Sequence, residues 1–250
     1  MAIIPSVPAP ESQQASISPV GRIFGVLFSP KATFEDIVRK PSWVLPVAVL
    51  ALLGLMVAIA MNHRVNWREN VSQQIEKSPQ ASQLSDEQKE KQIEAGAKIA
   101  PVIVYVFGVP APIILILVVA LILWGAYSLF AGVNPGYKTA VAIVSHAYVP
   151  AMIANVLFVI ILLLKDPSTL DLQNPVATNV AAFFPEDMPK WLDALGKNLD
   201  VFTVWILLLM AVGFAAVNPK KLKGGKSYGI AFGMFAFYLL VRVTMAYAFS

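Results

Sequence analysis

The sequence contains no cysteine, so it can form neither a disulfide bond nor a thiolate metal site. Charge is also scarce. Only 14% of the 250 residues are Asp, Glu, Lys or Arg, whereas 57% are hydrophobic and the mean hydropathy is +0.67. A soluble domain would carry roughly 25% charged residues. This composition argues against a soluble globular protein and predicts an integral membrane protein.

The sequence motifs of common enzyme classes are missing as well. His63 and His146 are the only two histidines, and the chain has no H-E-x-x-H, no G-x-S-x-G and no phosphate-binding loop. The first residues lack the pattern of a cleaved signal peptide, so we expect none. We therefore expect no enzymatic activity, no cofactor, no metal and no nucleic-acid partner, and we expect the lipid bilayer as the main surroundings of the protein.

Five hydrophobic segments are long enough to be candidate membrane spans, because a helix needs about 20 apolar residues to cross a bilayer core. The second is longer than required and contains Pro110 and Pro112, so it must tilt or break. The sequence predicts an all-α, five-transmembrane-helix bundle. The expected spans cover residues 43–61, 101–131, 140–164, 201–217 and 227–249.

The distribution of basic residues predicts the orientation of these spans. The short loops after the second and fourth spans carry Lys138 and the lysine group Lys220, Lys221, Lys223 and Lys226, with no acidic residue. The two longer loops on the opposite side mix basic and acidic residues. Since cytoplasmic loops are enriched in Lys and Arg, we predict a multi-pass inner-membrane protein with a cytoplasmic N-terminus and its C-terminus on the outer side.

The segments outside the spans differ in character. Residues 1–19 are rich in Pro, Ser and Gln and are expected to form a disordered cytoplasmic tail, followed by a membrane domain over residues 20–250. "GRIFGVLFSPKATFEDIVRK" has the alternating faces of an amphipathic interfacial segment, with Ile23, Phe24, Leu27 and Phe28 on one apolar face. Ser85 and Gln88 have capping-box spacing, which predicts a helix ending near Ala100, before Pro101. A short helix is also expected near residues 186–195.

The third span contains the polar stretch "SHAYVPAMIAN", residues 145–155. Pro150 has no N–H to bond the carbonyl of His146, so a kink is expected to open there. Ser145, Tyr148 and Asn155 share one helical face, which is typical of a helix-packing seam in a membrane. His146 lies on another face, so His146 and Pro150 form a separate candidate intramembrane polar site.

Two further sets of charged residues are candidate sites. Arg242 is the only formally charged residue within a predicted span, and Asp200 begins the neighbouring span on the same side of the membrane, so we predict that the two side chains pair. Lys220, Lys221, Lys223 and Lys226 are expected to contact lipid headgroups. Each could contribute on the order of 1 kcal/mol toward anionic lipids if it lies close to the surface.

Several stretches resemble a known family. "RIFGVLFSPKATFEDIVRKPSWVLP", "GVNPGYKTAVAIVSHAYVPAMI", "PVATNVAAFFP" and "LDVFTVWILLLMAVGFAAVNPKKL" are similar to the Yip (Ypt/Rab-interacting protein) domain family, and the last two to its bacterial branch. The resemblance extends over residues 22–243. It implies a cytoplasmic N-terminus, five helices and, in eukaryotic members, contacts with small GTPases in membrane traffic.

Two functional hypotheses follow. The first is a non-enzymatic protein with a membrane-organising or trafficking-type interaction role, whose partners are copies of itself or other membrane proteins. The alternative is a small transporter or channel that uses the proline-broken second and third spans, since broken helices build substrate sites in many transporters. A water-accessible cavity at His146 would favour transport, whereas a closed interior with exposed small-residue seams would favour the interaction role.

Overall fold

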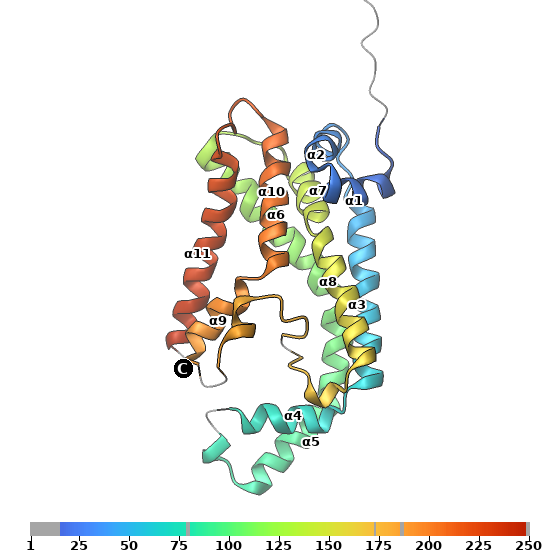
Figure 1. Ribbon diagram of the computed structural model, residues 1–250, viewed down its shortest axis with the longest axis vertical. Coiled ribbons are helices and arrows are strands. Elements are labelled where there is room, and N and C mark those ends of the chain that lie inside the picture. Colours follow the sequence, from blue (N-terminus) through green and yellow to red (C-terminus); the bar gives the residue numbers. More distant parts are fainter. Residues whose placement is uncertain (1–15, 79–80, 173, 186–187, 249–250) are drawn as a thin grey trace, which may run out of the picture.

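The computed structural model describes residues 16–78, 81–172, 174–185 and 188–248. Within these residues the regular elements are helices, apart from one isolated bridge between Asn179 and Asp200. The helices form an elongated bundle with α1 and α2 at one end and α4 at the other (Figure 1). We call these the N-terminal end and the far end. Most of the predicted disordered tail lies outside the described residues.

The helices follow one another along the bundle axis. At the N-terminal end lie α1 (Pro19–Phe28) and α2 (Pro30–Arg39), after which α3 (Val44–Arg64) runs to the far end. There the chain forms α4 (Trp67–Glu76) and returns through α5 (Asp86–Gly108) and α6 (Pro110–Ala131). The remaining helices are α7 (Tyr137–Ala147), α8 (Val149–Leu164), α9 (Lys190–Asn198), α10 (Val201–Val217) and α11 (Lys226–Ala248). Short 3-10 turns cover Ala81–Gln83, Pro167–Thr169 and Val180–Phe183.

The lengths of the hydrophobic helices confirm an all-α membrane bundle. By length and composition α3, α6, α7 with α8, and α11 can each cross a membrane. The remaining predicted span, α10, has 17 residues. At 1.5 Å per residue it rises about 25 Å, slightly less than the hydrocarbon core. The short helix expected near residues 186–195 begins later, at Lys190.

The second span breaks, as expected, but its boundaries differ from the prediction. The helix that begins at the Ser85 capping box was expected to end before Pro101, and instead it continues through Pro101 to Gly108. The break lies at Val109, between α5 and α6. One proline removes a single backbone hydrogen bond, whereas Pro110 and Pro112 act within one turn of each other. The closely spaced pair therefore ends the helix and the isolated Pro101 does not.

A close helix contact fixes the position of this break. A Cβ atom added to Gly54 of α3 would lie 2.3 Å from the carbonyl oxygen of Gly108. Only glycine leaves room for such an approach, which is the reason small residues are favoured where membrane helices cross. The Gly54 position therefore holds α3 against the end of α5.

The N-terminal segment is more deeply buried than an interfacial helix would be. In α2, Phe34 and Ile37 have no exposed surface, and a Cβ atom on Gly213 of α10 would lie 2.9 Å from the Phe34 ring. The predicted apolar face of α1 is only partly correct. The helix buries Arg22 and Val26, while Phe24 and Phe28 are 60% and 82% exposed. The two helices therefore cover the end of the bundle and leave one apolar edge of α1 outward.

Substitution of Gly54 tests the crossing of α3 and α5. We expect Gly54→Ala to lower the free energy of unfolding by about 1–3 kcal/mol, because the new methyl group overlaps the Gly108 carbonyl. The measurement is the midpoint of thermal unfolding in mild detergent. Gly125→Ala is the matched control, since a Cβ atom there meets nothing within 4 Å. Equal midpoints for the two variants would contradict the close contact.

Candidate functional site

The helix that carries the polar stretch is the most deeply buried part of the bundle. Every residue from Ala140 to Ala147 in α7 is buried. Contacts with α1, α2, α3, α6 and α10 surround this helix. Such complete enclosure requires small or apolar side chains on all faces, which the sequence "AVAIVSHA" supplies.

Pro150 interrupts this span at the expected place. The third span divides at Tyr148, where α7 ends at Ala147 and α8 begins at Val149. His146, just before the break, is 1% exposed. Its Nδ1 atom lies 2.8 Å from the carbonyl oxygen of Ala142 in its own helix, so Nδ1 is the protonated nitrogen that donates to this carbonyl.

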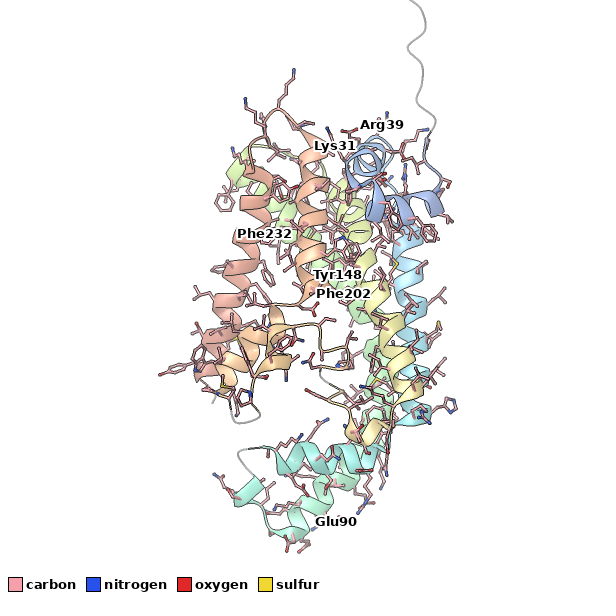
Figure 2. All side chains as sticks on the ribbon, viewed as in Figure 1. Lys31, Arg39, Glu90, Tyr148, Phe202 and Phe232 are labelled. Atoms are coloured by element: carbon pink, nitrogen blue, oxygen red, sulfur yellow. The ribbon has the colours of Figure 1, made fainter. Side chains whose placement is uncertain are left out.

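Two of the three residues in the predicted packing seam also form hydrogen bonds within the span. Ser145 Oγ donates to the Ala142 carbonyl at 3.1 Å, and Asn155 Nδ2 donates to the Ala151 carbonyl at 2.9 Å. Tyr148 is partly buried against the core and lies midway along the bundle in Figure 2. These two bonds give Ser145 and Asn155 partners within their own span. The seam residues can therefore pack closely but do not assemble a polar cluster with His146.

Asp200 and Arg242 do not form the ion pair that we predicted. Asp200 caps α10 by accepting hydrogen bonds from the backbone N–H groups of Phe202 at 2.8 Å and Thr203 at 3.2 Å, and it also accepts one from the Thr178 hydroxyl. Among the described residues, no ion pair within 4.0 Å joins Asp200 to Arg242, whose side chain is exposed. The prediction was wrong because the carboxylate finds its donors at the start of its own helix, where a carboxylate is favoured.

The ion pair that is buried lies at the N-terminal end, and sequence reasoning missed it. Arg22 Nη2 lies 2.8 Å from Asp36 Oδ2, and both side chains are at most 4% exposed. Arg22 Nη1 also donates to the Lys40 carbonyl at 2.9 Å and to Ser42 Oγ at 2.7 Å. One guanidinium therefore ties α1, α2 and the start of α3 together. By helical spacing Arg22 and Asp36 each lie roughly opposite the apolar face expected for their segment, so the local sequence pattern did not mark them as buried.

A second missed network joins three helices at the same end. Tyr127 of α6 is fully buried and its hydroxyl donates to the Ser227 carbonyl at 2.7 Å, while Ser227 Oγ donates to the Ala211 carbonyl of α10 at 2.6 Å. The Tyr127 ring stacks on Phe214 with the centroids 4.1 Å apart. This network fastens the beginning of α11 to α6 and α10.

The lysine loop lies beside the end of α6. Lys220, Lys221, Lys223 and Lys226 are all exposed. Lys221 Nζ donates to the Gly132 carbonyl at 2.9 Å, so the loop after α10 is bound to the loop after α6. The sequence Val-Asn-Pro occurs in both loops, at residues 133–135 and 217–219, and Asn134 and Asn218 each accept a backbone hydrogen bond there. Lys221 is therefore held by hydrogen bonds to both loops.

The far end contains a polar groove instead of a closed surface. It measures about 780 Å³ and lies between α4, the loop that precedes α9, and α9 itself. Nearby, Arg64 donates to the carbonyls of Leu162 and Lys165 at the end of α8, at 3.2 and 3.3 Å. Hydrogen bonds from the Ser168 backbone and hydroxyl lower the pKa of the Asp166 carboxyl. These contacts order the loop after α8.

The family model for the Yip1 domain matches residues 24–243 of this chain. The chain belongs to the Yip1 domain family. Comparison with curated proteins and with solved structures found no match. The matched residues include the second half of α1, all helices from α2 to α10, and α11 except its last turn. The match agrees with the resemblance found in the sequence.

The Yip1 domain offers few groups for catalysis or metal binding. Within the described residues, no set of three or more His, Asp or Glu side chains lies together in a way that could hold a metal ion. The buried ion pair of Arg22 and Asp36 holds the N-terminal helices α1 and α2 together. His146, Ser145 and Asn155 have hydrogen-bond partners in their own span. The exposed features described above are the lysine loop, the polar groove at the far end and the apolar surfaces of the outer helices.

Removal of one charge from the buried pair should destabilise the Yip1 domain strongly. We expect Asp36→Asn to lower the free energy of unfolding by about 3–5 kcal/mol, because it leaves the Arg22 guanidinium buried without its counter-charge. Thermal unfolding in detergent measures this. Glu35→Gln, at an exposed neighbouring position, is the matched control. The double variant Arg22→Met with Asp36→Leu should recover most of the loss, and a double variant as unstable as Asp36→Asn alone would contradict the charge argument.

Proposed function

We propose that this Yip1-domain protein is a non-enzymatic organiser of the membrane that acts by lateral contact with copies of itself or with other membrane proteins. The observation that carries the proposal is the enclosure of α7. His146 is buried, its Nδ1 is bonded within the helix, and Ala140 to Ala147 are covered on every side. A protein whose interior is closed in this way interacts with other molecules through its surface.

The lipid-facing surface supports the same proposal. Large apolar side chains are exposed along α3, α6 and α11, with Leu52, Leu121 and Leu240 more than half exposed. An exposed apolar surface is expected in a bilayer, so it does not by itself identify a partner. Together with a closed interior, it makes helix-to-helix contacts in the membrane available to the protein.

We also propose the orientation that the basic residues predict. The N-terminal end holds Lys31, Arg39 and the lysine loop, and Figure 2 shows Lys31 and Arg39 at that end and Glu90 at the far end. Basic residues close to a membrane helix favour the cytoplasmic side. In a bacterial inner membrane this places α1, α2 and both Val-Asn-Pro loops in the cytoplasm and the C-terminus outside.

Transport through the proline-broken helices is the alternative hypothesis, and reconstitution distinguishes the two. In liposomes that contain a pH-sensitive dye, we expect proton and potassium fluxes no larger than in protein-free liposomes. In native membranes, chemical crosslinking should trap species larger than a monomer. A flux that disappears in His146→Leu but persists in His63→Leu would support transport and contradict the proposal. His63 is exposed at the end of α3 and is the only other histidine. A protein that stays monomeric under crosslinking would also contradict it.

The absence of cysteine makes the orientation directly testable. We expect a membrane-impermeant maleimide to label Ser82→Cys, but not Lys223→Cys, on intact spheroplasts. Both positions are exposed, and they lie at opposite ends of the bundle. After the membrane is opened, both variants should react, which controls for reagent access. Labelling of Lys223→Cys alone on intact spheroplasts would reverse the proposed orientation.

A further inference from the structure

The surface of the bundle is hollowed between α6 and α11. The groove measures about 700 Å³ and has an almost entirely apolar lining. One wall is formed by Leu121, Gly125 and Leu129 of α6, and the other by Gly229, Gly233 and Phe237 of α11. Leu129 and Phe237 are 78% and 62% exposed, so the rims of the groove project outward. The groove faces the region that lipid would occupy.

The floor of the groove is open because no atom of the chain fills the space where the side chains of its glycines would be. A Cβ atom added to Gly125, Gly229 or Gly233 would meet nothing within 4 Å. This distinguishes the three from Gly54 and Gly213, whose missing side chains make room for another helix of the same chain. The space beside Gly125, Gly229 and Gly233 is therefore available to a molecule outside the chain.

The groove and a lysine lie on one helical face. Lys226 precedes Gly229, Ile230 and Gly233 by three, four and seven residues, the spacing of a single stripe on an α-helix. From Lys226 to Phe237 the helix rises about 16 Å, which is close to half of the ~30 Å hydrocarbon core. The stripe thus has the length of one leaflet, with a cation at its headgroup end.

Positive charge is concentrated above both walls. Lys226 stands at the start of α11, and Lys221 is held over the end of α6 by its hydrogen bond to the Gly132 carbonyl. Lys220 and Lys223 lie in the loop between α10 and α11, and Figure 1 shows this loop at the same end of the bundle as α1 and α2. Within the described part of the chain, no carboxylate lies within 4.0 Å of any of these lysines. Their charge is therefore available to an anionic group.

We infer that the groove binds one anionic phospholipid, with an acyl chain between α6 and α11 and the phosphate group beneath Lys221 and Lys226. The positive charge of the lysines favours this phospholipid over a second copy of the chain as the occupant of the groove. Two copies joined groove to groove in the same orientation would bring their lysine loops together, which is unfavourable. A phospholipid of negative charge complements both the apolar groove and the cations at its end. The inference does not depend on the interaction role proposed above.

Lipid retention by the purified full-length protein tests this inference. The protein is placed in detergent with phosphatidylglycerol or phosphatidylcholine, and bound lipid is measured by native mass spectrometry. We expect one phosphatidylglycerol to be retained in preference to phosphatidylcholine. Lys226→Gln should weaken phosphatidylglycerol binding about fivefold and leave phosphatidylcholine unchanged. Lys31→Gln is the matched control, because Lys31 is an exposed lysine of the same end on α2, across the bundle from α11 in Figure 2.

A variant that fills the groove separates the contribution of the acyl chain to binding from that of the headgroup. Gly233→Leu should weaken binding of both lipids, because its side chain occupies the space beside Gly125, and it should leave the unfolding midpoint unchanged. Equal effects of Lys226→Gln and Lys31→Gln would overturn the inference by showing a general surface attraction. Loss of self-association in Gly233→Leu, with lipid retention unchanged, would also overturn it and would assign the groove to a second copy.

Discussion

The buried ion pair between Arg22 and Asp36 is the interaction on which the N-terminal end of the bundle depends. Removing two charges from water costs several kcal/mol each unless their geometry is close and the remaining donors are used. Here the guanidinium also reaches Lys40 and Ser42, so three segments are held by one side chain. With α2 fixed in this way, Phe34 fills the space beside Gly213. Phe34 and the rest of α2 thereby cover α7. Because α7 is enclosed by other helices, its side chains have to be small or apolar.

Several polar side chains in and beside this enclosure are satisfied by carbonyls of their own segments. Thr33, Ser145 and Asn155 each donate to a carbonyl three or four residues earlier. Such bonds meet the requirement of a dry interior, where an unpaired polar group costs several kcal/mol, but they do not select a neighbouring helix. Selection comes from a few other contacts. The close approach at Gly54 fixes α3 against α5, and the bonds from Tyr127 to Ser227 fix α6 against α11.

Local sequence signals predicted the parts of the fold that depend on local physics. Hydrophobic length located the spans, the Ser85 capping box started α5, and closely spaced prolines broke the second span. The ion pairs depended on tertiary contacts instead. Arg22 and Asp36 are 14 residues apart and pair only once α1 and α2 fold back on each other, while Asp200 was drawn to its own helix start. No periodic pattern distinguishes these outcomes, so the sequence predicted a pair that does not form and missed the one that does.

The position of α11 shows how a closed interior and an exposed groove arise together. At its beginning, the Tyr127 and Ser227 network fastens α11 to α6, and Lys221 joins the adjoining loops. Toward the far end it contacts α9 instead. Only Ser227 and Ala231 of α11 are buried. Between the two attachments the glycines supply no side chains to close the space beside α6. The groove is therefore a consequence of how α11 is held, and it can exist without opening the core around His146.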